Sequence, residues 1–112
     1  MIDAVTDATF ATEVVDAPTP VLVEFGASWC PPCRAMAPVL ADVSREREGR
    51  LRVVTVDADE NHVSADRLGV MAVPTLLLFV GGEPLRRFVG YTAKSKLLRL
   101  VDEVVEDLPP AH

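Results

Sequence analysis

Apolar positions along this chain follow two different spacings, and each spacing predicts a different kind of element. Short, continuous apolar runs rich in valine and leucine predict strands typical of a buried sheet. Apolar residues three or four positions apart, with polar residues between them, predict helices. The predicted strands cover residues 21–25, 51–56, 75–80 and 85–89. The predicted helices cover residues 6–17, 31–48 and 93–107, and a short one ends at Leu68.

The connections between these elements indicate the topology. Val53 and Val54 form an unbroken apolar stretch, which is typical of a strand buried on both faces of a parallel sheet. Residues 81–84, Gly-Gly-Glu-Pro, predict a tight turn that joins two antiparallel strands. The resulting order, (β)αβαβαββα, predicts an α/β fold in which a central mixed β-sheet lies between two layers of helices.

Composition and charge narrow the function classes. The chain has 112 residues, of which 49% are hydrophobic, so we expect a single domain over residues 1–112 with a loose tail at 109–112. Its net charge is −6 and no basic run is longer than Arg86-Arg87, which argues against binding to nucleic acid. A monomer is expected at this size.

Neither a membrane segment nor an export signal is expected. The longest apolar run, residues 76–80, is far below the roughly 20 residues that a spanning helix requires. The first residues lack the basic and apolar regions of a signal peptide. We therefore expect a cytoplasmic protein, in a compartment where thiol pairs cycle instead of staying oxidised.

Both cysteines lie in the motif Trp29-Cys30-Pro31-Pro32-Cys33, directly after a predicted strand. Residues i and i+3 of a helix are about 5–6 Å apart at Cβ, so a small adjustment closes a disulfide. As a structural crosslink this short loop would stabilise the fold by only roughly 2 kcal/mol. Structural zinc usually takes four ligands, and the only other soft ligands are His62 and His112. A redox-active pair is favoured over a metal site or inert thiols.

The predicted helix N-terminus at this motif assigns a role to each sulfur. Exposed N–H groups and the helix dipole favour a thiolate on Cys30, whose pKa we expect below the ordinary value of about 8.5. Cys33 lies one turn further in, where we expect it to be more shielded and protonated. Cys30 is thus the predicted nucleophile and Cys33 the predicted resolving thiol. Pro31 and Pro32 fit the first turn, whose N–H groups have no intrahelical partner.

Glu24 lies inside an apolar strand that we expect at the centre of the sheet. A carboxylate in that place is costly, and burial should raise its pKa. Two interpretations remain: Glu24 serves the chemistry of the cysteine pair, or its long stem carries the carboxylate out to solvent.

Three motifs occur together in this chain: the cysteine motif at the start of the second helix, Val73-Pro74-Thr75, and the Gly81-Gly82-Glu83 hairpin. With these motifs the chain resembles the thioredoxin family over about residues 3–108. Further matching segments are Val23-Glu24-Phe25, Ala37-Pro38, Val56-Asp57-Ala58-Asp59 and Val89-Gly90. The resemblance implies the thioredoxin fold.

Three features differ from the most familiar pattern of that family. The spacer between the cysteines is Pro31-Pro32 where Gly-Pro is usual, and Gly26 stands where many members carry a second tryptophan. The buried acid is Glu24 instead of aspartate, and Thr55 replaces the lysine that is often its neighbour. These differences affect the redox potential and the proton chemistry, and they leave the reaction type unchanged.

The resemblance also implies roles for individual residues. Glu24 would accept the proton of Cys33, through a water. Pro74 would follow a cis peptide bond that places the Val73 backbone beside Cys30. An apolar docking surface for target segments is implied as well, and its expected residues are Trp29, Pro32, Ala72, Val73, Gly90 and Tyr91.

The function implied by the resemblance is that of a general protein-disulfide reductase. Its redox centre would be the Cys30–Cys33 disulfide itself, with no bound cofactor or metal. An NADPH-dependent flavoprotein reductase would recharge it. Two alternatives stay open: a disulfide oxidase or isomerase on the same fold, and a non-catalytic subunit that binds a partner through the apolar surface.

Overall fold

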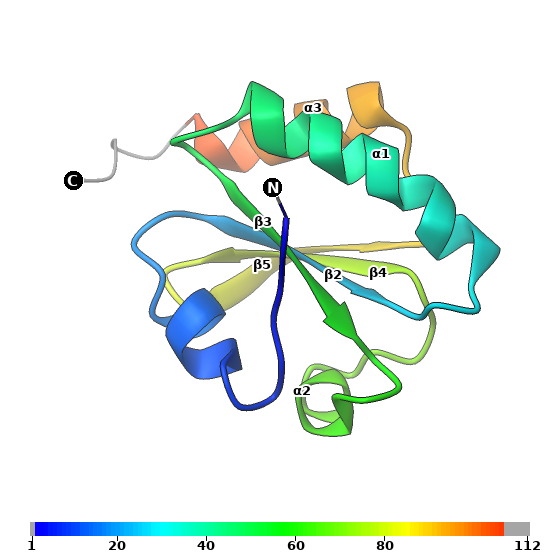
Figure 1. The fold of residues 1–112 in the computed structure, drawn as a ribbon. Coiled ribbons are helices and arrows are strands. Elements are labelled where there is room, and N and C mark those ends of the chain that lie inside the picture. Colours follow the sequence, from blue (N-terminus) through cyan, green and yellow to red (C-terminus); the bar gives the residue numbers. More distant parts are fainter. Residues whose placement is uncertain (1, 107–112) are drawn as a thin grey trace.

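The computed structural model describes residues 2–106, which form a mixed sheet with helices on both faces (Figure 1). The expected tail at 109–112, and residue 107 of the expected last helix, lie outside the described residues. In chain order the elements are β1 (Asp3–Ala4), the π-helix η1 (Ala11–Val15), β2 (Val21–Gly26), α1 (Pro31–Glu46), β3 (Arg52–Asp57), α2 (His62–Arg67), β4 (Thr75–Val80), β5 (Glu83–Val89) and α3 (Lys94–Val105).

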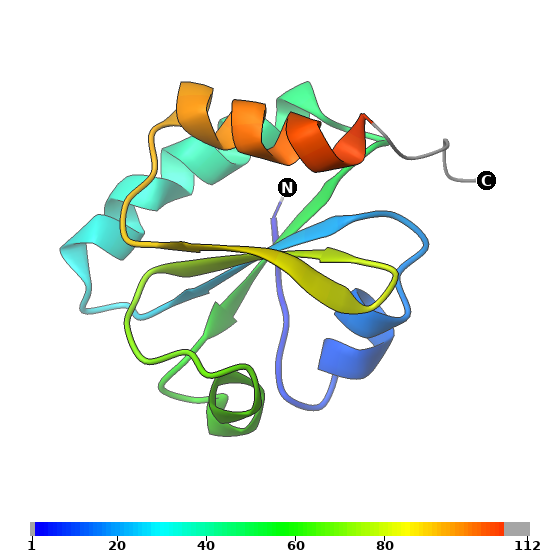
Figure 2. The ribbon, with the colours of Figure 1, turned by 180° about the vertical axis from the view of Figure 1, so that it is seen from behind.

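The five strands lie in the spatial order β1-β3-β2-β4-β5, with β2 at the centre. β2 runs parallel to β3 and antiparallel to β4, which makes the sheet mixed. In Figures 1 and 2, α1 and α3 cover one face of the sheet, whereas η1 and α2 cover the other. The predicted sheet between two layers of helices is confirmed.

Side chains of β2 alternate between the two faces, and every residue of this strand is buried. Leu22 packs in the core formed with α1 and α3, and Glu24 and Gly26 follow it on the same face. Val23 and Phe25 belong to the second core, on the η1 and α2 side. Glu24 therefore faces α1, the helix that carries Cys33.

The predicted helix over residues 6–17 is wrong in its first half. Thr6 and Thr9 form a turn instead, in which the Thr6 N–H donates to Thr9 Oγ1 at 3.0 Å and the Thr9 N–H donates to the Thr6 carbonyl at 3.1 Å. The regular part is limited to η1, Ala11–Val15. Hydroxyl side chains that bond to nearby backbone compete with a continuous helix, which explains the difference.

The hairpin between β4 and β5 is tighter than the predicted turn over residues 81–84. Glu83 already pairs with Val80, and Pro84 pairs with Phe79, so only Gly81 and Gly82 form the turn. A register shift between Leu78 and Phe79 accompanies the proline. Proline is tolerated here because β5 is an edge strand. The other strand and helix boundaries agree with the prediction within two residues.

An ion pair holds the two helices of the upper layer together. Arg47, just after α1, donates from Nε and Nη2 to both carboxylate oxygens of Asp102 on α3, at 2.8 and 2.7 Å. Such a two-point contact constrains direction as well as distance. It lies at the end of α1 opposite Cys30, so it supports the helix that presents the cysteine motif.

Candidate active site

Cys30 occupies the N-cap of α1, in the position that a serine or aspartate often takes. Its backbone is extended, with φ −91° and ψ 111°, and Pro31 and Pro32 form the first helical turn. The Cys33 N–H donates to Cys30 Sγ at 3.3 Å. The sulfur of Cys30 thus accepts a hydrogen bond from a backbone N–H of the first turn of α1, which has no partner within the helix.

The loop before β4 brings a second element to the same sulfur. The Cys30 thiol donates to the Val73 carbonyl at 3.7 Å. The Val73–Pro74 peptide bond is cis, which confirms the prediction for Pro74. Gly90, with φ at +89°, donates its N–H to the Pro74 carbonyl at 2.8 Å and so joins the end of β5 to this loop.

Both cysteines are free thiols, and both are buried. The exposed fraction is 2% for Cys30 and 7% for Cys33, so the expectation that Cys33 is the more shielded of the two is wrong. Cys30 is covered because it packs against Ala27 and against Val73. Cys33, by contrast, borders a cavity on the side of Gly26.

Glu24 is buried directly beside Cys33. Only 6% of its surface is exposed, and its Oε2 has no hydrogen-bond partner among the described residues. A carboxylate carried out to solvent on a long stem is therefore not what is found. Burial raises the pKa of Glu24 to about 7. Burial is also the largest cause that raises the pKa of Cys33, to about 12, with smaller contributions from Cys30 and Glu24.

The residues that the sequence predicted for docking differ in how far they are exposed. Trp29 is 63% exposed, and Ala72 and Tyr91 are exposed as well. Val73 and Gly90 are half-buried. The Val73 carbonyl accepts from Cys30, and the Gly90 N–H donates to the Pro74 carbonyl. Met71, next to Ala72, is 96% exposed and extends the apolar surface.

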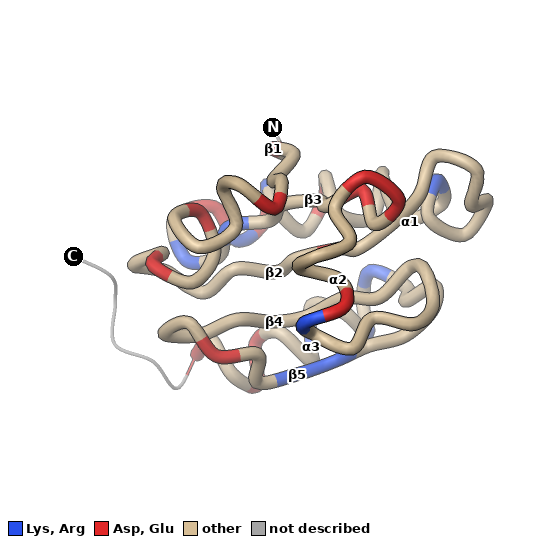
Figure 3. The backbone as a smooth tube through the Cα atoms, turned by 90° about the horizontal axis from the view of Figure 1, so that it is seen from below, with Lys and Arg blue, Asp and Glu red and all other residues tan. Residues whose placement is uncertain are grey.

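Asp59 is a residue of this surface that the sequence did not predict. Trp29 donates its indole N–H to Asp59 Oδ2 at 2.7 Å. Asp59 lies in the acidic segment between β3 and α2 (Figure 3). The signal was topological: β2 and β3 are parallel neighbours, so the segments that follow them meet at one edge of the sheet.

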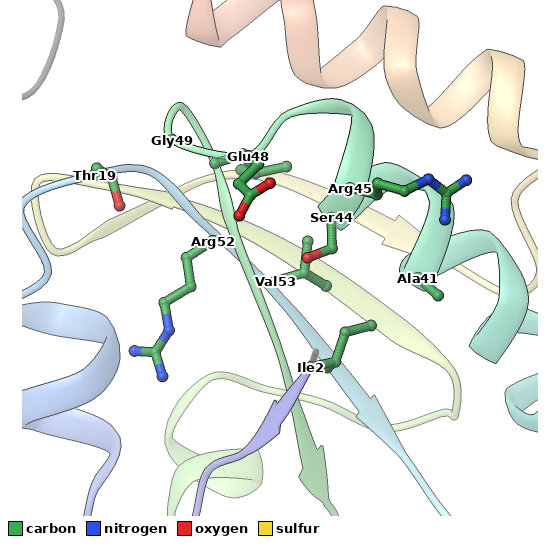
Figure 4. A pocket seen from close by; sticks show the side chains of 10 residues that line it. Ile2, Thr19, Ala41, Ser44, Arg45, Glu48, Gly49, Arg52 and Val53 are labelled. Carbon is green, nitrogen blue, oxygen red and sulfur yellow. The ribbon is translucent and has the colours of Figure 1, made fainter.

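Two cavities differ in their relation to the cysteines. One of about 550 Å³ lies at the far end of α1, between Ala41, Ser44, Arg52 and Val53 (Figure 4), and it has no cysteine in its lining. A smaller one, of about 220 Å³, is bordered by Cys33. Within residues 2–106, no three or more His, Cys, Asp or Glu side chains gather in a group suited to a metal ion.

Over the described part of the chain, no helix has both the length and the apolar character required to cross a bilayer.

Comparison with known proteins decides the family. The family model described as Thioredoxin matches residues 1–103. The chain belongs to the thioredoxin family. It is 46% identical to a thioredoxin of Mycobacterium tuberculosis over 104 residues, which is 93% of this chain and 90% of that protein. It is 42% identical to thioredoxin 1 of Nostoc sp. over 99 residues, which is 88% of this chain and 92% of that one.

A third relative joins the family's domain to another activity. It is a protein of Mycobacterium leprae named bifunctional thioredoxin reductase/thioredoxin, 43% identical over 104 residues that make up 93% of this chain and 23% of that protein. Family membership and the cysteine pair identify this chain as a thiol–disulfide oxidoreductase, and more narrowly as a protein-disulfide reductase.

Proposed function

We propose that this member of the thioredoxin family reduces disulfides of cytoplasmic proteins, with Cys30 as the attacking sulfur and Cys33 as the resolving sulfur. The observation that carries the assignment is the N-cap position of Cys30, whose Sγ accepts the Cys33 N–H at 3.3 Å. Negative charge is favoured at the start of a helix, and a thiolate is the form of cysteine that attacks disulfides.

The reaction proceeds in two exchanges. The Cys30 thiolate attacks one sulfur of the target disulfide, and the other target sulfur leaves as a thiolate that takes up a proton. Cys33 then loses its proton, and its sulfur attacks Cys30 in the mixed disulfide, which releases the second target thiol. The target gains two electrons and two protons, and the Cys30–Cys33 disulfide remains. Pro31 and Pro32 hold the first turn of α1 rigid between the two sulfurs.

Glu24 is the acceptor for the Cys33 proton in this scheme. The thiol has its pKa raised to about 12, so it needs a base when it attacks. Glu24, with its pKa raised to about 7, is partly ionised near neutral pH and lies beside that thiol. Its Oε2 has no hydrogen-bond partner within residues 2–106, so it can receive the proton directly or through a water.

Target segments dock on the surface around Cys30. Pro74, with its cis bond, presents the Val73 backbone next to the attacking sulfur, and an extended segment adds to that backbone. Exposed apolar side chains surround the place where the segment would lie. The docking residues are Trp29, Pro32, Ala72, Val73, Gly90 and Tyr91.

An NADPH-dependent flavoprotein thioredoxin reductase recharges the disulfide, and the name of the Mycobacterium leprae relative supports a thioredoxin reductase as partner. The chain acts as a single domain and a monomer without a bound cofactor or metal. The cytoplasm suits it because the chain has only two cysteines, placed for cycling instead of crosslinking.

Reduction of insulin tests the proposal. With dithiothreitol as reductant, the wild-type protein should accelerate insulin reduction, and with NADPH and a thioredoxin reductase it should support continuous NADPH oxidation. Cys30→Ser is the matched control, since oxygen replaces a single sulfur, and it should have no activity in either assay. Wild-type protein that fails to exceed this control would overturn the proposed function.

A further inference from the structure

Gly26 differs from every other glycine of the chain. Gly49, Gly69, Gly81, Gly82 and Gly90 all have positive φ, which favours glycine, whereas Gly26 does not. Its backbone is ordinary strand, paired with Asp57, and its carbonyl accepts the Ala58 N–H at 2.9 Å. Glycine weakens a strand, so its presence here has a different reason, such as the close approach of another group.

The side chains above Gly26 indicate that reason. A Cβ at this position would lie 3.2 Å from Glu24 Oε1 and 3.5 Å from Cys33 Sγ. The missing side chain therefore leaves space at the two groups between which the proton is exchanged. That space is part of a cavity of about 220 Å³, whose rim includes Ser28 and Asp57.

The cavity is large enough for water. One water needs roughly 10–15 Å³ of such space, and the volume of this cavity is far larger. A water also needs two to four polar partners. Glu24 Oε2, which has no partner among the described residues, supplies an acceptor. The titratable and charged groups that border the cavity are Glu24 on β2, Cys33 and Arg34 on α1, and Asp57 on β3.

We propose that Gly26 opens a water-filled passage from solvent to Glu24 and Cys33, and that this passage sets how fast the Cys33 proton leaves during release of the target. Gly26 is thus a positioning residue that acts through Glu24. This inference rests on the proposed role of Glu24, and it adds a route by which Glu24 itself returns the proton to solvent after each cycle.

A substitution that fills the space tests the passage. Gly26→Ala is compatible with the strand backbone, and it brings a methyl group to the mouth of the Glu24–Cys33 contact. In a single-turnover assay with a preformed mixed disulfide on Cys30, release of the target should slow on the order of tenfold, within the contribution that general base catalysis makes. Formation of the mixed disulfide, in which Cys30 attacks and Cys33 keeps its proton, should keep its rate.

Gly26→Ser is the matched variant, because it adds the same Cβ together with a hydroxyl that can carry a proton. It should release the target faster than Gly26→Ala. Equal slowing by both variants would mean that crowding of the strand, and not loss of water, is responsible, and it would overturn the proposal. Unchanged release in Gly26→Ala would overturn it as well.

Titration of Glu24 gives a readout apart from activity. Followed by NMR of the side-chain carboxyl, the pKa of Glu24 should rise above its wild-type value of about 7 in Gly26→Ala, because removing water further disfavours the charged form. An unchanged or lowered pKa would contradict the passage.

A double-mutant cycle separates this proposal from the proposed function. If the passage speeds release by serving Glu24, Gly26→Ala should slow release no further in the Glu24→Gln background. Additive slowing would overturn the passage. Slow release in Glu24→Gln with normal release in Gly26→Ala would leave the role of Glu24 standing and remove the passage alone, whereas normal release in Glu24→Gln would remove the role of Glu24 itself.

Discussion

The indole N–H of Trp29 donates to the carboxylate of Asp59 at 2.7 Å. The contact joins the residue before Cys30 to the segment after β3, although thirty positions separate them. Trp29 is largely exposed, and this hydrogen bond limits the orientation of its ring. A large aromatic side chain held in place offers docking area at low conformational cost.

Loss of that carboxylate should weaken docking and leave the chemistry intact. Asp59→Ala should raise KM for insulin about two- to tenfold with kcat nearly unchanged, as a net hydrogen-bond contribution of about 0.5–1.5 kcal/mol implies. Trp29 is the only tryptophan of the sequence, so a decrease in fluorescence anisotropy should report its release. Asp59→Asn keeps an acceptor and is the control. A lower kcat with constant KM would contradict the docking role.

The two cysteines should behave differently when each is replaced by serine. Cys33→Ser should accumulate covalent complexes between Cys30 and target proteins, because the resolving sulfur is absent. Cys30→Ser should accumulate none. Nonreducing electrophoresis with mass spectrometry of the adducts distinguishes them, and complexes that form only through Cys33 would reverse the assignment.

Burial of Glu24 should make the stability of the protein depend on pH. Its pKa is raised from 4.5 to about 7, so the folded chain holds the proton more tightly than the unfolded chain. The stabilising effect of protonation is complete below pH 4.5 and is lost as the pH rises through 7. Glu24→Gln does not titrate, so at pH 8 it should be more stable than wild type by about 3 kcal/mol.

Chemical denaturation from pH 4.5 to 8 measures this difference. The unfolding free energies of wild type and Glu24→Gln should be similar at the acidic end and should separate progressively towards pH 8. A difference in unfolding free energy that stays constant over this pH range would contradict the prediction. It would show that the pKa of Glu24 is the same in the folded and unfolded chains.

The ion pair between Arg47 and Asp102 should make a modest contribution to stability. Both side chains are about three-quarters buried, and Arg47 lowers the pKa of Asp102. The pair therefore stabilises the fold above the ordinary pKa of aspartate, and this effect disappears as the pH falls through the lowered value. A double-mutant cycle with Arg47→Met and Asp102→Asn should give a coupling of about 1 kcal/mol at pH 7. The coupling should decline as the pH falls through the lowered pKa of Asp102, and a coupling that stays constant over the acidic range would exclude an ionic origin.

Local sequence signals correctly predicted the strand and the helix that carry Glu24 and the two cysteines. The apolar run of β2 placed Glu24 in the sheet centre, and the Cys30–Cys33 motif marked the start of α1, because both signals depend on residues close in the chain. The first helix was predicted too long because apolar spacing was the only signal used for it. There the apolar spacing was correct, but hydroxyl groups at Thr6 and Thr9 closed a turn that spacing does not register.

Contacts between segments that are distant in the sequence could be identified only in the folded structure. Asp7 accepts the N–H groups of Val63 at 3.1 Å and Ser64 at 2.8 Å, and so caps α2 in place of the local residue Asn61, whose side chain makes no capping bond. Nothing in the spacing of these residues indicates the contact. It follows from the position of the N-terminal turn beside α2 on the same face of the sheet.

The amino-acid sequence by itself determined the order of elements, the buried central strand and the two sulfurs at a helix start. These features follow from the alternation of apolar residues and from backbone preferences over a few neighbouring positions. Tertiary structure alone decided that Cys30 is less exposed than Cys33, that Trp29 donates to Asp59, and that Gly26 borders a cavity beside Glu24. Those outcomes depend on strand register and on how α1 lies over the sheet, which no short segment encodes.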